Sequence, residues 1–146
     1  MTFGNLLSKR RPKANKLDTS HVCYTIPCMD CEKRYIGHTK RKLRIRLNEH
    51  KKSREGDLAS ISPNPNHNNG ILYHQAQTGH VFDFDNAVIL EHEKNFFRRR
   101  VLEGIHIQIA KSTDLSTNIN SGLKLDNFWM PFIQVLSTLT HSQSAI

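Results

Sequence analysis

A chain of 146 residues can form one domain with a hydrophobic core but is too short for two ordinary domains and a linker. Its 21 lysines and arginines against 13 aspartates and glutamates give a net charge of +8, which favours a polyanionic partner. No apolar run approaches the roughly 20 residues of a membrane span and residues 1–7 make no secretory signal, so we expect a soluble, intracellular protein.

Composition divides the chain into three parts. Residues 1–20 are basic and lack periodicity, which is typical of a flexible arm. Residues 21–136 contain the apolar segments of a single domain, and we expect residues 137–146 to form a disordered tail.

A β-hairpin is predicted at the start of this domain. Residues 21–26 and 33–37 are rich in β-branched and aromatic side chains, and Pro27 ends the first run. Tyr24 and Tyr35 lie on the two arms, where cross-strand side chains can face one another. In the first arm Cys23 is expected to be a buried, inert thiol.

An amphipathic helix is predicted directly after the hairpin. Thr39 is a suitable N-cap, and Leu43 and Leu47 repeat at helical spacing up to about residue 52. Arg46 and His50 are four residues apart, so this helix places both on one face. A guanidinium there can clamp a phosphate while the imidazole binds or moves a proton, although a solvated pair is the alternative.

The second half of the domain is expected to be mainly helical. A long loop over 55–70 precedes a short helix over 71–77, which Gly79 ends. A strand over 81–91, interrupted near 85–86, leads to a helix from Asn95 to about residue 110. The predicted buried stripe of that helix is Phe97, Val101, Ile105 and Ile109, and residues 125–136 form the last packed segment.

The basic residues are clustered, which is typical of a surface that binds nucleic acid. A solvated face is the alternative interpretation. The predicted DNA contacts are Lys40, Arg41, Lys42, Arg98, Arg99 and Arg100.

Two cysteines and two histidines have the composition of a structural zinc site. Cys28 and Cys31 have the two-residue gap of a zinc knuckle, and His74 and His80 flank a predicted helix end. Two thiolates and two imidazoles complete a tetrahedral site. Other histidines remain candidates for the last two ligands, namely His67, His92 and His106.

The hairpin motifs resemble those of the GIY-YIG nuclease family. Val22-Cys23-Tyr24 stands in place of Gly-Ile-Tyr, and Tyr35-Ile36-Gly37 is complete. The resemblance implies an α+β domain, in which helices flank a three-stranded antiparallel sheet. It also implies a catalytic site made of Tyr24, Tyr35, Arg46 and Glu103, with His50 matching a histidine found in several branches.

In this family the later-helix carboxylate, here Glu103, holds a catalytic Mg²⁺ or Mn²⁺. Glu91 and Glu93 are rival carboxylates that match no family motif. An ion pair of Glu103 with Arg99 or Arg100 is the alternative role.

The cysteine pair indicates one branch of that family. Residues 26–31 directly before the second motif, with His74 and Thr78-Gly79-His80, resemble the endonuclease domain of Penelope-like retroelements. There a Cys-Cys-His-His zinc site is embedded in the fold, and the similarity covers about residues 22–133. It implies that Asn118 closes the active site, with Asn120 as a near alternative. A purely structural asparagine in a turn is the other interpretation.

The implied function is hydrolysis of one strand of a double-stranded DNA target. Tyr24, assisted by His50, would be the base or its relay, Tyr35 would orient the phosphate or nucleophile, and Arg46 would neutralise developing charge. In the nucleus the nick would prime reverse transcription, with an upstream reverse transcriptase domain and element RNA as partners. The alternatives are an inactive zinc-stabilised DNA-binding module and a repair or homing endonuclease of the same fold.

Overall fold

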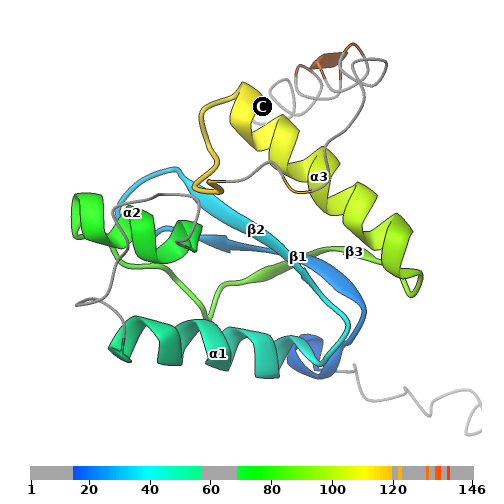
Figure 1. The fold of residues 1–146 in the computed structure, drawn as a ribbon, viewed down its shortest axis with the longest axis horizontal. Helices are drawn as coiled ribbons and strands as arrows, with labels where there is room; N and C mark the ends of the chain where they lie inside the picture. The colour runs from blue at the N-terminus through cyan, green and yellow to red at the C-terminus, as the bar shows by residue number, and fades with distance from the viewer. Residues whose placement is uncertain are drawn as a thin grey trace, which may run out of the picture.

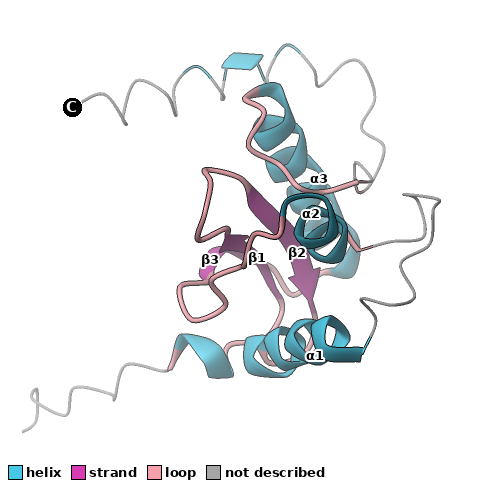
Figure 2. Cartoon of the chain, turned by 90° about the vertical axis from the view of Figure 1, so that its left-hand side faces the viewer, coloured by secondary structure: helices cyan, strands magenta, loops and turns pink. Residues whose placement is uncertain are grey.

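The computed structural model describes residues 15–56 and 69–119, together with the isolated positions 122, 131, 134, 135 and 138. These residues form an α+β domain with a three-stranded antiparallel sheet in the order β2-β1-β3. Helices α1 and α3 lie on opposite sides of the sheet (Figures 1 and 2). The fold class expected from the sequence is therefore confirmed at the level of architecture.

The predicted hairpin is confirmed as strands β1 (Val22–Pro27) and β2 (Arg34–Thr39). Strand β1 is central and pairs on its other side with β3 (Val88–His92). The predicted strand over 81–91 was too long. Asp83 accepts hydrogen bonds from the backbone and side-chain amides of Asn86, and this turn separates β3 from an isolated bridge at Phe82.

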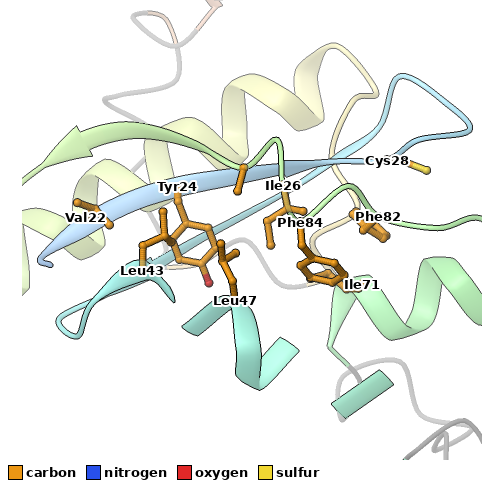
Figure 3. Close-up of a cluster of buried hydrophobic side chains, with 10 residues drawn as sticks. Val22, Tyr24, Ile26, Cys28, Leu43, Leu47, Ile71, Phe82 and Phe84 are labelled. Carbon is orange, nitrogen blue, oxygen red and sulfur yellow. The ribbon is translucent and has the colours of Figure 1, made fainter. Parts of the chain in front are cut away.

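One hydrophobic core lies between the sheet and α1 (Leu43–Gly56). It includes Ile71 of α2 (Gly70–Thr78). Figure 3 shows side chains of β1 reaching towards Leu43 and Leu47 on α1. The buried members are Val22, Tyr24, Ile26, Cys28, Leu43, Leu47, Ile71, Phe82, Phe84 and Ala87.

The opposite face of the sheet packs against α3 (Phe96–Ser112), where Ile36 contacts Ile107 and Ala110. The stripe predicted for this helix was wrong. Phe97 is 64% exposed, and the buried residues of the helix are Arg99, Gly104, Ile107 and Ala110. The helix is therefore turned relative to the prediction, because its N-terminal half buries an arginine.

The ends of two helices agree with the sequence signals. Asn95 caps α3 and Gly79 ends α2 with a φ of 73°, whereas the cap of α2, Asn69, lies in the segment that was expected to be a loop. Thr39 is not the N-cap of α1: it is the last residue of β2, and α1 begins at Leu43. The Thr39 hydroxyl instead accepts from the Arg41 amide.

The folded part begins before the predicted boundary at His21. A 3-10 turn, η2 (Lys16–Asp18), packs on the domain: Lys16 donates to the Ala87 carbonyl, and the Thr19 carbonyl accepts from the Leu43 amide. Residues 1–14 of the arm predicted over 1–20 lie outside the described residues, as do most of the loop over 55–70, of the segment over 125–136 and of the tail over 137–146. None of the described helices is long and apolar enough to cross a membrane.

Candidate functional site

The register of β1 and β2 places the two motif tyrosines on the same face of the hairpin, and Gly37 leaves room beside them. Tyr24 pairs with Gly37 across the strands, and Tyr35 pairs with Ile26. A Cβ at position 37 would lie 2.7 Å from the Tyr24 hydroxyl and 3.1 Å from the Tyr35 ring. The glycine of the second motif is therefore required by the fully buried Tyr24 phenol beside it.

Helix α1 brings its Arg46 and His50 to this pair of tyrosines. The Arg46 Nε donates to the Tyr24 hydroxyl at 3.3 Å, and His50 Nε2 lies 2.9 Å from the same oxygen. The His50 ring also meets the Tyr35 ring edge-on, with centroids 5.2 Å apart. Four of the predicted site residues thus form one connected cluster.

Asn69 is a member of this cluster that the sequence analysis missed. Its Oδ1 accepts from the Ile71 amide at 2.8 Å as the cap of α2, so its NH₂ group is the one that faces His50 Nδ1, at 3.3 Å. Burial, reinforced by the charge of Arg46, lowers the pKa of His50 to about 4, so the ring is neutral near pH 7. A neutral ring that accepts at Nδ1 carries its proton on Nε2 and donates it to Tyr24.

Glu103 approaches from α3, on the other side of the sheet. Its carboxylate lies 3.7 Å from Nε2 of His38, a second residue that the sequence analysis missed. Burial raises the pKa of Glu103 to about 7, against the opposing charges of Arg100 and Arg46. Of the two alternative partners expected for Glu103, Arg99 is engaged with other groups, whereas Arg100 lines the same pocket and acts on the carboxylate through its charge.

Arg99 is 2% exposed and has a structural role. Its Nε donates to His38 Nδ1 at 3.3 Å, and its Nη1 donates to the carbonyls of Glu93 and Lys94. Most of the Arg99 side chain is therefore engaged inside the protein, and the part that remains accessible lines a pocket with Arg41 and Arg46. The other predicted contacts lie at the surface or at a pocket: Lys40, Arg41 and Lys42 connect β2 to α1, Arg98 is exposed, and Arg100 lines the pocket described next.

A pocket of about 410 Å³ is lined by Tyr35 from one face of the sheet and by His38 and Glu103 from the other. It therefore lies across the outer edge of β2. Arg100 and Phe96 complete one wall. Tyr24, Arg46 and His50 do not line it, so Tyr35, Glu103 and Asn118 are the predicted catalytic residues that reach this space.

Asn118 lines the same pocket and binds the outer edge of β2 like a partner strand. Its Oδ1 accepts from the Ile36 amide at 2.9 Å and its Nδ2 donates to the Ile36 carbonyl at 2.7 Å. Asn120, the alternative, lies outside the described residues. Asn118 is thus placed at the site, with both halves of its amide committed to the backbone.

The predicted zinc ligands form one compact cluster. The ligand atoms of Cys28, Cys31, His74 and His80 all lie within 4.8 Å of one another. His74 Nε2 lies 3.6 Å from Cys28 Sγ, 3.5 Å from Cys31 Sγ and 3.2 Å from His80 Nδ1. Tetrahedral Zn–S and Zn–N bonds imply separations of about 3.6 Å between S and N and about 3.3 Å between two N atoms.

The donor chemistry agrees with this geometry. A single imidazole nitrogen cannot make hydrogen bonds to three partners at once, whereas a shared cation explains why three donor atoms surround His74 Nε2. The rival histidines do not join them: His106 pairs with Glu91, His92 lies in β3, and His67 lies outside the described residues. This cluster can hold a metal ion such as zinc.

The rival carboxylates for the catalytic site are also engaged elsewhere. Glu91 lies 3.6 Å from His106, and Glu93 accepts from the Asn95 amide. Neither lines the pocket that contains Glu103.

Comparison with known protein families, with curated proteins and with solved structures found no match.

Proposed function

We propose that this chain is a DNA endonuclease of the GIY-YIG type, which hydrolyses one phosphodiester bond of a double-stranded target. The observation that supports it most is that Tyr35 and Glu103 line one pocket, with the connected Arg46, Tyr24 and His50 side chains grouped around Tyr35. A phenol, a carboxylate and a guanidinium around one space suit a phosphate and an attacking water.

The residues of the pocket also suit a divalent cation. Mg²⁺ and Mn²⁺ prefer oxygen ligands and keep several waters, so one carboxylate with adjacent open space is a sufficient protein contribution. Glu103 offers this carboxylate. Among the described residues its nearest chargeable partner is His38, whose Nε2 lies 3.7 Å away, and burial together with the nearby Arg99 lowers the pKa of His38 and favours its neutral form. A bound cation would polarise the phosphate and make its bound water more acidic.

The chain's own residues would divide the remaining work. Tyr35 reaches the pocket and would orient the phosphate or the attacking water. Arg46 lines the adjoining pocket, and from there it would neutralise the charge that develops on the phosphate. Tyr24 is fully buried and does not line the pocket, so it would act by orienting Arg46, whose Nε donates to its hydroxyl.

DNA suits the surroundings of this pocket. Arg100 lines it, and Phe96, which is 59% exposed, lines both this pocket and a second, basic pocket that holds Arg41 and Arg46. Cations beside an exposed aromatic ring are typical of surfaces that bind nucleotides. Zinc in the Cys28, Cys31, His74 and His80 cluster would tie the hairpin to α2 and so support the β2 edge.

The biological setting is proposed from the resemblance to Penelope-like retroelements. The nick would provide the 3′-hydroxyl for reverse transcription in the nucleus, with a reverse transcriptase domain upstream and element RNA as partners. A repair or homing endonuclease would use the same site for another target.

The alternative from another class is a zinc-stabilised DNA-binding module without catalysis, which the +8 charge and the metal cluster also favour. Incubation of the purified chain with supercoiled plasmid separates the two. An endonuclease converts plasmid to the open circle with Mg²⁺ or Mn²⁺ and stops when EDTA is added. A binding module retards the plasmid on a gel and leaves it supercoiled in every condition.

A further inference from the structure

Two arginines converge on a single carboxylate beside the proposed active site. Arg41 Nη2 lies 2.6 Å from one carboxylate oxygen of Glu49, and Arg46 Nη1 lies 3.1 Å from the other. Arg41 belongs to the connection between β2 and α1, whereas Arg46 and Glu49 belong to α1. Glu49 is therefore held between two guanidinium groups, one on each oxygen.

The space around the two guanidinium groups is cationic. Arg41 and Arg46 line a second pocket of about 330 Å³ together with Lys40, and Glu49 is not among its lining residues. His38 and Phe96 line both this pocket and the one that contains Glu103, so the two pockets adjoin. The first turn of α1 contains no acidic residue of its own.

The pairing with Glu49 is easy to exchange. The side chains of Arg41, Glu49 and Arg46 are 50%, 36% and 35% exposed, respectively. Ion pairs at this exposure are weak, because water screens them and long side chains lose freedom on pairing. A phosphodiester presents two non-bridging oxygens that share one negative charge, as the two oxygens of a carboxylate do. Arginine binds both groups in a forked geometry.

We propose that Arg41 and Arg46 form a binding site for a backbone phosphate of DNA, and that Glu49 occupies this site in the free protein. The inference rests on the proposed function and deepens it in two ways. Arg41 becomes a second phosphate ligand beside Arg46, and Glu49 becomes an internal competitor that the substrate displaces. Once displaced, the Glu49 carboxylate is released to solvent.

The chain offers a matched control for this proposal. Asp18 also pairs with two cations, Lys42 and Arg44, at the start of α1. Glu49→Gln and Asp18→Asn change the net charge by the same amount, so a general electrostatic effect on DNA affinity is common to both. Arg41→Gln and Arg44→Gln form the corresponding pair for the arginines, since both side chains are about half exposed.

The experiment measures binding of each full-length variant to a short duplex in EDTA, with melting temperatures as a check on folding. We expect Glu49→Gln to tighten binding about five-fold relative to Asp18→Asn, the effect of removing one competing ion pair. Arg41→Gln should weaken binding more than Arg44→Gln. In addition, inorganic phosphate should perturb the Arg41 and Arg46 side-chain NMR signals more strongly in Glu49→Gln than in the parent.

Equal effects of Glu49→Gln and Asp18→Asn on duplex affinity would overturn the phosphate site. This failure is distinguishable from failure of the nuclease proposal. A selective gain in Glu49→Gln, in a protein that never nicks plasmid with Mg²⁺ or Mn²⁺, keeps the phosphate site and rejects the enzyme. Nicking by the parent with no selective gain does the reverse.

Discussion

Asn69 sets the tautomer of His50. The Asn69 oxygen is committed to the cap of α2, so its NH₂ group faces His50 Nδ1 at 3.3 Å, and the ring proton lies on Nε2. The Tyr24 oxygen therefore receives two hydrogen bonds, one from His50 and one from Arg46. In this arrangement His50 donates to the Tyr24 oxygen and does not accept the Tyr24 proton. His50 would therefore assist Tyr24 only by stabilising negative charge on its oxygen, and not as a proton acceptor.

The first prediction tests this arrangement with Asn69→Asp. The aspartate keeps the cap but presents an acceptor to His50 Nδ1, so the ring proton should move to Nδ1 and leave Nε2 as an acceptor. Nitrogen NMR of the His50 ring reports which nitrogen carries the proton. We expect the Nε2–H tautomer in the parent and the Nδ1–H form in the variant. An Nδ1–H ring in the parent would refute the assignment.

The second prediction concerns pH. The folded pKa of His50 is about 4 and its ordinary value is 6.5, so the unfolded chain takes up this proton first as the pH falls. His50 should therefore cost the fold stability progressively from pH 6.5 to about pH 4, by up to about 3 kcal/mol. Urea unfolding of the parent and of His50→Gln at several pH values measures this contribution. Parallel pH profiles for the two proteins would show that His50 is not the group responsible.

The third prediction concerns the metal cluster. Purified protein should contain about one zinc per chain, and Cys28→Ser should lose it and melt at a lower temperature, because a structural zinc contributes folding free energy. Cys23→Ala is the control: this thiol is buried, donates to the Arg99 carbonyl and lies outside the cluster, so zinc content should be unchanged. Zinc-free parent protein with undiminished stability is the result that this assignment does not survive.

The fourth prediction concerns Gly37. A Cβ there would lie 2.7 Å from the Tyr24 hydroxyl and 2.9 Å from its ring carbon, so Gly37→Ala should destabilise the domain by about 1–3 kcal/mol through overcrowding. Tyr24→Phe removes the closest atom and should recover part of this loss in the double variant. Denaturant unfolding of the two single variants and the double variant measures the coupling. Strictly additive losses would indicate that the two residues do not crowd each other.

Local signals in the sequence were sufficient for much of the fold. Pro27 and Gly79 ended a strand and a helix where predicted, and Asn95 capped α3. The spacing of Cys28 and Cys31 was sufficient to predict the metal cluster, because structural zinc is bound by few residue types, chiefly cysteine and histidine. Thr39 misled because a residue type that favours helix caps also suits a strand, and here β2 extends to it.

The features that were missed depend on contacts between distant segments. The apolar spacing of α3 predicted the wrong buried face, because Arg99 lies on the face that is buried. The burial of Arg99 depends on its hydrogen bonds to the carbonyls of Glu93 and Lys94, which apolar periodicity does not reveal. His38 joins the site only through strand register and the position of α3. Asn69 could be found as a helix cap, but its contact with His50 arises from the placement of α2 beside α1.

The most direct test of the central claim is plasmid nicking by a Glu103→Gln protein, with Glu91→Gln as the matched control on β3. The nuclease account predicts that Glu103→Gln loses nicking on the order of 100-fold or more, because the proposed cation ligand is gone. It should bind DNA as well as the parent or better, since a negative charge near phosphate is removed. Glu91→Gln should nick at the parental rate. A Glu103→Gln protein that nicks as fast as the parent would contradict both the metal role of Glu103 and the proposed active site.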